Sequence, residues 1–321
     1  MYKLDKKDKE ILYQLDINSR QSDSQIAKKV RLNKNTVWYR INRLVETRII
    51  QKFVTLINPI KFGKSIYKLY IRLQDVTDET WESIKKYLIS HKQVFWVVRC
   101  EGIWDVITAV WVRDPYEFYV FYIDFSTRFN KYILEKAVTN QIEVPFYSRS
   151  YFVEKEGVIK CTWGGEVVPA KIDQIDYKLL QILTINARIP STELAKKLNT
   201  TPRIVSYRIK ELIKKNVIGA FSILPNRDAL GLDYYKVIFY LKNLTKHREN
   251  AFIDYCRRQG NVLYYIKTLG PWELELELEV RDHKHLNQIT NLIRKEFNDI
   301  IRNYETILIT EEYKGEYNTL Q

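Results

Sequence analysis

The chain reads LDKKDKEILYQLDINSRQSDSQIAKKVRLNKNTVWYRINRL over residues 4–44 and IDQIDYKLLQILTINARIPSTELAKKLNTTPRIVSYRIKEL over residues 172–212. The second stretch repeats the first at an offset of 168 residues, and the same offset keeps matching further along the chain. Because the offset never changes, no insertion separates the copies, and so long a repeat predicts a two-domain protein duplicated in tandem. The matched pairs include Asp5 and Asp173, Asn18 and Asn186, Arg20 and Arg188, Tyr39 and Tyr207, Gly102 and Gly270, and Trp104 and Trp272.

In the first part of each copy, apolar residues recur at helical spacing in three short runs. Asp5 is the expected N-cap of the first helix, Ser22 and Gln25 form an expected capping box before the second, and the third begins after Asn33. Residues 52–57 then alternate as a short strand. Three short helices followed by a small strand pair are typical of a winged helix-turn-helix domain.

After residue 64 the pattern changes to strands that alternate with helices. The expected order, strand, helix, strand, strand, helix, strand, is that of a ferredoxin-like αβ sandwich, so the fold class is α+β. Copy two repeats this order from Tyr234 to about Glu311. The expected strands of copy one are Ile66–Gln74, Val94–Cys100, Trp104–Val112 and Tyr132–Val144, and the expected helices are Thr77–Ser90 and Asp114–Phe129.

These patterns divide the chain into four domains and a linker. Gly157, Gly164, Gly165 and Pro169 mark the linker, which has room for a short hairpin. The predicted boundaries are 1–60 and 171–228 for the winged helix-turn-helix domains, 64–152 and 232–314 for the ferredoxin-like domains, and 153–170 for the linker.

The net charge of +13 lies entirely on the two helix-turn-helix domains. Residues 1–60 hold 13 Lys and Arg against 6 Asp and Glu, and residues 170–230 hold 11 against 5, while the rest of the chain is neutral in sum. Positive charge confined to two small helical domains suits the phosphates of a nucleic acid. It predicts double-stranded DNA as the partner.

The third helix of each helix-turn-helix domain is the candidate recognition element. Val37, Ile41 and Leu44 must face the core in copy one, which turns polar, basic and aromatic residues outward. Asn, Arg and Lys near a helix N-terminus reach base edges, and basic residues elsewhere suit phosphates. For Arg40 and Arg208, an ion pair with Asp8 and Asp176 of the first helix is an equally good interpretation. The predicted DNA-binding residues are Lys34, Asn35, Thr36, Trp38, Tyr39, Arg40, Arg43, Thr201, Arg203, Ser206, Tyr207, Arg208 and Lys210.

The remaining composition argues for an ordinary globular protein inside the cell. Hydrophobic residues make up 45% of the chain, with only 10 Gly and 8 Pro. No apolar run reaches the ~18 residues of a membrane helix, and the N-terminus lacks an apolar signal core, so a cytoplasmic location is expected. Cys100, Cys161 and Cys256 lie far apart, which predicts reduced and buried thiols, no metal and no cofactor.

The motifs resemble the Lrp/AsnC family of prokaryotic transcription regulators over nearly the whole chain. Leu4-Asp5-x-x-Asp8-x-x-Ile11-Leu12, Asn18-x-Arg20 and Val37-x-x-Arg40-Ile41-x-x-Leu44 follow its helix-turn-helix pattern, and copy two repeats them. The resemblance implies that the ferredoxin-like domains sense small molecules and pair with each other.

The chain differs from the usual members of the family in two ways. Family members usually carry one copy per chain and pair two chains, whereas this chain holds both halves, so we expect an intrachain pseudo-dimer that can associate further. Where the family usually has Gly after the recognition helix, the chain has Arg48 and Asn216. Asn tolerates a left-handed conformation better than Arg.

The family's Gly-x-aromatic-acid turn is present in both copies. The resemblance implies that an amino-acid-like effector binds around this turn, where paired sensing domains meet. Glycine admits close backbone approach, Trp stacks, and a carboxylate pairs with an ammonium group. Taken alone, the residues also fit a tight turn with a core Trp. The predicted effector-binding residues are Gly102, Trp104, Asp105, Gly270, Trp272 and Glu273.

The segment Glu273–Glu279 alternates Glu with Leu, which places four glutamates on one face of a strand. The corresponding positions of copy one are Asp105, Ile107, Ala109 and Trp111. One interpretation is a solvated acidic face. The other is that the two sheets pack together and that Lys68, Arg72, Lys236 or Lys242 pair with these glutamates.

Together these features predict a sequence-specific transcription regulator, modulated by an effector, that reads an asymmetric operator. Asymmetry is expected because the recognition helices differ, KNTVWY at 34–39 against PRIVSY at 202–207. The alternative is an enzyme, because sirohaem-type decarboxylases resemble this architecture and are sometimes fused. Their carboxylated tetrapyrrole calls for a His- and Arg-rich pocket, and none of the four histidines, His91, His247, His283 and His285, lies in the Gly-x-Trp turns. We therefore expect no enzymatic activity.

Overall fold

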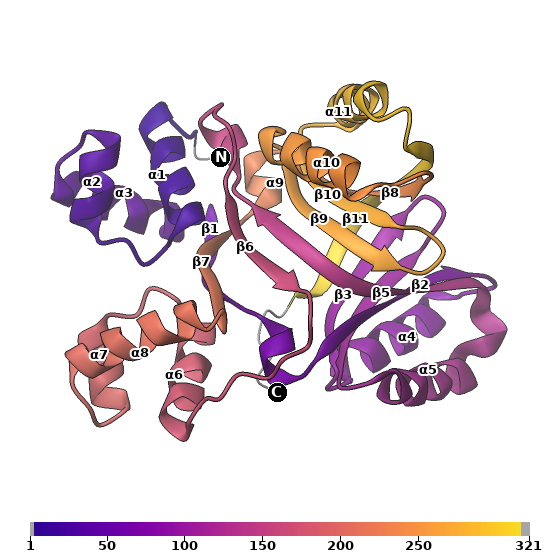
Figure 1. Cartoon of the computed structure of the whole chain (residues 1–321), viewed down its shortest axis with the longest axis horizontal. Coiled ribbons are helices and arrows are strands. Elements are labelled where there is room, and N and C mark those ends of the chain that lie inside the picture. Colours follow the sequence, from indigo (N-terminus) through magenta and orange to yellow (C-terminus); the bar gives the residue numbers. More distant parts are fainter. Residues whose placement is uncertain (1–2, 316–321) are drawn as a thin grey trace.

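The computed structural model describes residues 3–315 and consists of two lobes (Figure 1). Two small helical domains, here called head 1 and head 2, form one lobe. Two ferredoxin-like domains, here called domain 1 and domain 2, form the other. None of the helices in the described part combines the length and the apolar character of a membrane span.

Each head contains three helices and one strand, and the helices of head 1 have the N-caps that the sequence predicts. Asp5 and Ser22 cap α1 and α2 through capping boxes, and Asn33 caps α3. Arg48 and Asn216 both adopt φ 55°, so both copies make the left-handed turn after the third helix. Head 1 comprises α1 (Lys6–Ile17), α2 (Asp23–Val30), α3 (Lys34–Glu46) and β1 (Ile50–Ile57), and head 2 comprises α6 (Gln174–Ile185), α7 (Ser191–Lys197), α8 (Pro202–Lys214) and β7 (Ile218–Pro225).

The wing differs from the expected strand pair within each head. Each head supplies one strand, and β1 pairs antiparallel with β7 of the other head. The physical reason is shared burial: Phe53 and Ile57 pack into the core of head 2, while Ile223 packs into the core of head 1. The two heads are therefore joined through a common two-stranded ribbon (Figure 1).

The ferredoxin-like domains show the predicted element order. Their elements are β2 (Ser65–Leu73), α4 (Asp78–Ser90), β3 (Val94–Glu101), β4 (Val106–Val112), α5 (Pro115–Phe129) and β5 (Ile133–Tyr147) in domain 1, and β8 (Asp233–Leu241), α10 (Lys246–Arg258), β9 (Val262–Leu269), β10 (Leu274–Val280), α11 (His283–Glu296) and β11 (Ile301–Gly315) in domain 2. Short helices η1 (Pro59–Phe62), η2 (Asn130–Tyr132) and α9 (Arg227–Leu230) lie between them.

The strands of both domains form one sheet that closes on itself. Its order is β2-β4-β3-β11-β8-β10-β9-β5, and β5 pairs again with β2. Helices α4 and α5 cover the outside of domain 1, and α10 and α11 cover the outside of domain 2 (Figure 1). Residues from both domains meet in the interior, among them Tyr70, Trp104 and Trp272. In addition to the core beneath its own helices, each domain thus contributes to one shared interior core, as expected for an intrachain pseudo-dimer.

The linker between the copies is itself ordered. It follows η3 (Ser150–Phe152) and contains β6 (Ile159–Gly164), and β6 adds to the edge of β5 rather than forming a separate hairpin. At the start of the linker, Val153 follows the buried Phe152 and packs against the core of head 1. The linker therefore packs against both lobes.

The acidic strand β10 faces the interior of the closed sheet, so the interpretation as a solvated face is wrong. Glu275, Glu277 and Glu279 are buried. The Nζ of Lys68 lies 2.7 Å from Glu275 Oε2, and the Nζ of Lys236 lies 2.7 Å from the same oxygen and 2.6 Å from Glu277 Oε1. Lys68 and Lys236 are thus the predicted partners that the structure confirms.

Arg72 and Lys242, the other two predicted partners of the glutamates, lie on the surface. Arg72 pairs with Glu135, and Lys242 is exposed. The buried cluster of Lys68, Lys236, Glu275 and Glu277 is formally neutral, which lessens the cost of removing four charges from water.

Burial of Glu275 works to raise its pKa, but Lys236 and Lys68 outweigh burial and hold the pKa well below the ordinary value. Glu277 behaves in the same way. A carboxylate whose pKa is lower in the folded than in the unfolded chain stabilises the fold above its unfolded pKa. That contribution is lost as the pH falls through the folded value.

We expect the Glu275→Gln substitution to lower the free energy of unfolding by about 3 kcal/mol, because it leaves two buried ammonium groups with one carboxylate. The loss is measured at neutral pH by thermal and urea denaturation. The matched control is Glu101→Gln, which changes an exposed strand residue and should stay within about 0.5 kcal/mol of the parent protein.

Acid provides a second test of the same cluster. The difference between Glu275→Gln and the parent protein should shrink as the pH falls below the ordinary glutamate pKa of 4.5, because Glu275 of the unfolded parent then takes up a proton while the folded carboxylate stays charged, which favours unfolding of the parent alone. A difference that is independent of pH, or no loss at neutral pH, would contradict a stabilising role for the cluster.

Candidate nucleic-acid interface

The two recognition helices are fixed at their N-termini by their caps. Asn33 Oδ1 accepts a hydrogen bond from the Thr36 amide at 2.7 Å, and Thr201 Oγ1 accepts one from the Ile204 amide at 3.3 Å. Pro202 occupies the first position of α8, where its missing N–H costs nothing. These caps leave the remaining N-terminal amides of both helices available to an anion.

The predicted outward faces of both recognition helices are exposed. In α3, Trp38 and Tyr39 are 58% and 57% exposed, and in α8, Tyr207 is 63% exposed. Large aromatic rings beside basic and amide groups are costly on a solvated surface and suit a partner surface. The predicted residues that are exposed are Lys34, Asn35, Trp38, Tyr39, Arg43, Thr201, Arg203, Ser206, Tyr207 and Lys210, and Thr36 is half-buried.

Arg40 and Arg208 make the ion pairs that the sequence offered as their second interpretation. Arg40 Nη1 lies 2.7 Å from Asp5 Oδ2 and 2.7 Å from Asp8 Oδ1. In head 2, Arg208 Nη1 makes the same pair of contacts with Asp173 and Asp176, each at 2.8 Å. Both arginines therefore tie the recognition helix to the first helix of its own head, and a role in contacting phosphate stays a prediction.

Arg20 and Arg188 join the two heads, a role that the sequence reasoning missed. Arg20 Nη1 donates to the carbonyl oxygens of Ala187 and Ile189 at 2.7 and 2.9 Å. In return, Arg188 donates to the carbonyl oxygen of Gln21 at 2.8 Å and pairs with Asp23. The sequence does contain a signal for this contact, because Asn-x-Arg occurs at the same place in both copies. A reciprocal contact between two copies needs the same residue in each of them.

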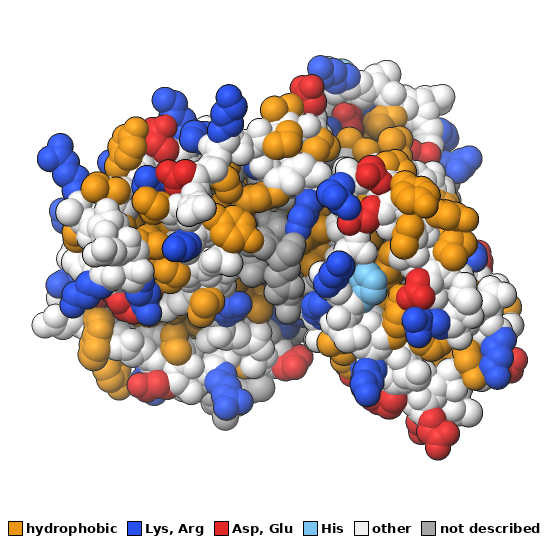
Figure 2. Space-filling view, turned by 90° about the horizontal axis from the view of Figure 1, so that it is seen from below, with side chains coloured by type: hydrophobic (Ala, Val, Ile, Leu, Met, Phe, Trp, Pro, Cys, Tyr) orange, Lys and Arg blue, Asp and Glu red, His pale blue; other side chains and the backbone are white. Residues whose placement is uncertain are grey.

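Basic side chains dominate the lobe of the heads. Figure 2 shows blue side chains outnumbering red ones over that lobe, whereas both colours are interspersed over the ferredoxin-like domains. This distribution agrees with the charge counted in the sequence. It gives the heads the electrostatic character of a phosphate-binding surface.

The residues of the Gly-x-Trp-acid turns mainly make contacts that stabilise the fold. Trp104 and Trp272 are buried with ring centroids 6.3 Å apart, and a Cβ at Gly102, which has φ 132°, would lie 3.1 Å from the carbonyl oxygen of Thr306. Asp105 Oδ2 accepts from the Leu73 amide at 2.7 Å. In domain 2, Glu273 Oε2 accepts from the Leu241 amide at 2.7 Å, and a Cβ at Gly270 would lie 2.7 Å from a carbonyl oxygen.

The tryptophans of these turns therefore belong to the core, as in the second interpretation, and their rings do not line a surface pocket. Of the six predicted effector-binding residues, only Asp105 lines the adjoining cavity of domain 1. Effector binding at the other five stays a prediction.

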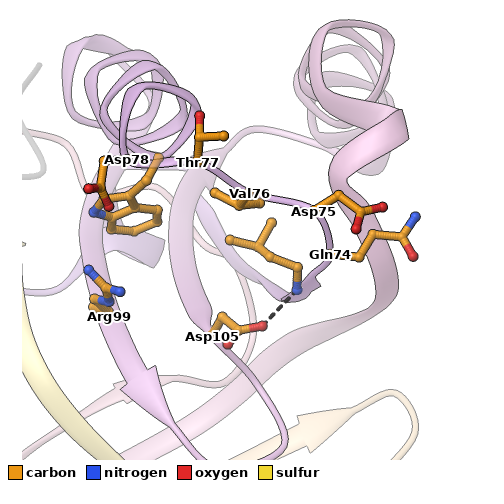
Figure 3. A pocket seen from close by; sticks show the side chains of 9 residues that line it. Gln74, Asp75, Val76, Thr77, Asp78, Arg99 and Asp105 are labelled. Atoms are coloured by element: carbon orange, nitrogen blue, oxygen red, sulfur yellow. Dashed lines mark hydrogen bonds between the residues drawn. The ribbon is translucent and has the colours of Figure 1, made fainter.

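This cavity of about 280 Å³ lies between the end of β2, the start of α4 and the strand β3, beside the turn that precedes β4. Figure 3 shows Arg99 and Asp78 on one side and Asp105 at its floor, with the hydrogen bond from Leu73. The guanidinium of Arg99 lies 5.0 Å from the ring centroid of Trp81. The cavity thus presents one cation and several carboxylates. Its lining residues are Leu73, Gln74, Asp75, Val76, Thr77, Asp78, Trp81, Arg99 and Asp105.

The corresponding surface of domain 2 carries different charges. Lys246, Glu249 and Lys267 stand at the positions of Asp78, Trp81 and Arg99. Lys267 Nζ lies 3.2 Å from Glu143 Oε2 and 3.3 Å from Glu249 Oε2, so carboxylates of the chain already neutralise it. The two domains are therefore not equivalent as ligand sites.

A larger cleft of about 640 Å³ lies between head 2 and β11. Its charged residues are mostly acidic, and its arginine, Arg227, pairs with Glu312. The acidic residues that line it are Asp228, Asp233, Glu311 and Glu312. No histidine lines it in the described part of the chain.

The histidines and cysteines lie elsewhere. His91 packs among Tyr87 and Phe121, His247 and His283 are exposed, and His285 is half-buried. Cys100, Cys161 and Cys256 are free and buried, as predicted. Within residues 3–315, no cluster of His, Cys, Asp and Glu has the arrangement of a metal site.

The architecture defines a tandem protein with paired winged helix-turn-helix heads, whose recognition helices are exposed. Known families agree: an AsnC-type helix-turn-helix domain matches residues 172–213, and a winged helix-turn-helix DNA-binding domain matches residues 4–51. An uncharacterized HTH-type transcriptional regulator of Pyrococcus abyssi is 32% identical over 151 residues, which is 46% of this chain and 97% of that protein. The regulator LrpB of Bacillus subtilis is 28% identical over 149 residues, covering 46% and 95%. The chain belongs to the Lrp/AsnC-type family of helix-turn-helix DNA-binding regulators and carries two copies of its unit.

A solved structure shares the tandem arrangement. The siroheme decarboxylase NirDL superposes with a TM-score of 0.63 over 96% of this chain and 92% of its own, at 12% sequence identity. At this identity the likeness shows the fold alone.

Proposed function

We propose that the chain is a transcription regulator that binds an asymmetric DNA operator with its two heads. The observation that carries the proposal is the pair of exposed recognition helices, which differ in their outward residues while the heads that carry them are joined by β1 and β7. Each helix enters a major groove, and the half-sites lie about one helical turn, ~34 Å, or a multiple of it apart. Arg203 reads base edges, and Lys34 and Lys210 contact phosphates or bases near the helix starts.

We expect Lys34→Ala and Arg203→Ala each to weaken DNA binding about 10-fold, because each removes one charged contact from one recognition helix. The DNA is selected from a random double-stranded pool, and affinity is then measured by electrophoretic shift across salt concentrations. Lys284→Ala, an exposed lysine of domain 2, is the matched control and should bind as the parent protein does.

Two results would contradict this proposal. Binding that ignores both salt and the two substitutions would show that the recognition helices do not contact DNA. Selection of a clean inverted repeat by a single chain would show that the heads read equivalent half-sites.

A second candidate function is sirohaem-decarboxylase-like catalysis, which the tandem likeness to NirDL favours. The charge of the large cleft speaks against it, because a carboxylated tetrapyrrole needs cationic partners and the cleft is mostly acidic. Absorbance titration with iron uroporphyrin discriminates the two: tight binding with a shifted Soret band would favour the enzyme.

We also propose that an amino-acid-like effector binds in the cavity of domain 1. Arg99 supplies the cation for a carboxylate, and Asp78 and Asp105 supply carboxylates for an ammonium group. Because the equivalent basic group of domain 2 is already paired, one effector binds per chain.

We expect titration calorimetry with each of the twenty amino acids to reveal binding with a stoichiometry of one. Arg99→Ala should weaken the affinity about 10-fold or more, since it removes a charged hydrogen-bond donor. Lys267→Ala, at the equivalent position of domain 2, is the control and should leave the affinity unchanged. Loss of binding in the control but not in Arg99→Ala would place the effector elsewhere.

A further inference from the structure

A cluster of four buried charges lies where head 1, the linker and domain 2 meet. It consists of Asp16 from α1, Arg149 after β5, Lys160 from β6 and Glu279 from β10, here called the Asp16 cluster. Asp16 is 0%, Arg149 5% and Glu279 1% exposed, and the Lys160 side chain is 4% exposed. The DNA-binding surface does not include these residues, and the interior cluster of Glu275 is separate from them.

Arg149 connects a helix of head 1 to a strand of domain 2. Its amide and its Nη1 each donate to the Asp16 carboxylate at 2.8 Å. Its Nε donates to Glu279 Oε2 at 2.9 Å, and the Tyr151 hydroxyl donates to the same oxygen at 2.6 Å. A planar guanidinium that holds two carboxylates fixes their relative orientation as well as their distance.

Lys160 completes the cluster from the linker. Its Nζ lies 3.0 Å from Asp16 Oδ1 and donates to Ser222 Oγ of β7 at 3.2 Å. Burial works to raise the pKa of Asp16, but Lys160 and Arg149 overcome it and hold the pKa below the ordinary value. The carboxylate is therefore charged, as the geometry requires.

Copy two does not repeat this arrangement. The position of Asp16 is occupied by Thr184, whose hydroxyl donates to the Gln181 carbonyl oxygen of its own helix at 2.7 Å. The position of Glu279 corresponds to Trp111, which stacks on Phe95. Head 2 thus lacks the acidic anchor that head 1 carries.

We infer that Arg149 is a positioning residue that orients head 1, and not head 2, on the ferredoxin-like domains. The inference rests on the proposed DNA-binding function. Holding Asp16 fixes α1, and α1 fixes the recognition helix α3 through the Arg40 ion pairs and a shared core. Head 1 presents its recognition helix in one orientation. The helices of head 2 are held through the β1 and β7 ribbon, whose Ser222 hydroxyl donates to the Asp16 carbonyl oxygen at 2.7 Å, and through Arg20 and Arg188.

The test compares hydrogen exchange in the two heads of the full chain. We expect Arg149→Met to accelerate amide exchange about 10-fold in α1 to α3 while α6 to α8 exchange as in the parent protein, because only head 1 loses its anchor. Arg149→Lys should restore part of the protection, since it keeps the charge. Arg128→Met, which breaks a surface pair with Asp124 on α5, is the matched control and should change neither head.

Exchange that rises equally in both heads, or in neither, overturns the inference. If Arg149→Met does not fold, Glu279→Gln provides the same comparison at smaller amplitude, about 3-fold, because it removes one charge without changing shape. If Glu279→Gln changes amide exchange equally in both heads relative to the parent protein, the inference is overturned as well.

A DNA readout separates this inference from the proposed function. On the selected operator, Arg149→Met should lose protection of one half-site about 10-fold in a footprint and retain the other, and Arg149→Lys should recover part of it. If the parent protein does not bind DNA, the proposed function fails while the exchange comparison still decides the role of Arg149. If the parent protein binds and the protection of both half-sites falls equally in Arg149→Met, the variant has lost stability in general and the inference is overturned.

Discussion

The pairing of domain 1 with domain 2 depends on opposite charges that are buried between these two ferredoxin-like domains. Lys68 of domain 1 and Lys236 of domain 2 share the carboxylates of Glu275 and Glu277 inside a closed sheet. Domain 1 contributes a lysine and no glutamate at these positions, since Ile107 and Ala109 correspond to Glu275 and Glu277. Two copies of domain 1 would bury unpaired cations, and two copies of domain 2 would bury an excess of carboxylates, so each domain is complementary to the other and not to itself.

The complementarity of the two domains also fixes how the two heads are placed. Because domain 1 and domain 2 meet in one way, the linker and the β1–β7 ribbon hold the two heads in one order. The unequal recognition helices then occupy defined places relative to each other. Differences between the halves therefore extend through the molecule, from the interior charges to the domain 1 cavity and the outward faces of α3 and α8.

Much of this could be predicted from the sequence, because the repeat displayed each motif twice. The helices, their caps and the strand order follow from periodicity, and the outward faces of α3 and α8 follow from the positions of their core residues. Pairing across the chain could not be predicted in the same way. A local pattern does not show that β1 pairs with β7, that the tryptophans of the turns face each other, or that Arg20 bonds to the other head. The contacts of Asp16 could not be predicted for another reason. Its counterpart in copy two is a threonine, so comparison of the two copies does not mark this position.

The β1–β7 ribbon and the closed sheet join segments of one polypeptide, and this changes how assembly depends on concentration. Two separate chains must first meet, so the fraction that is paired falls on dilution. Here the partner is tethered, and its effective concentration is set by the chain itself and not by the amount of protein in solution. Pairing of the heads within the chain is therefore a first-order process that does not depend on the protein concentration, even when only a few molecules are present.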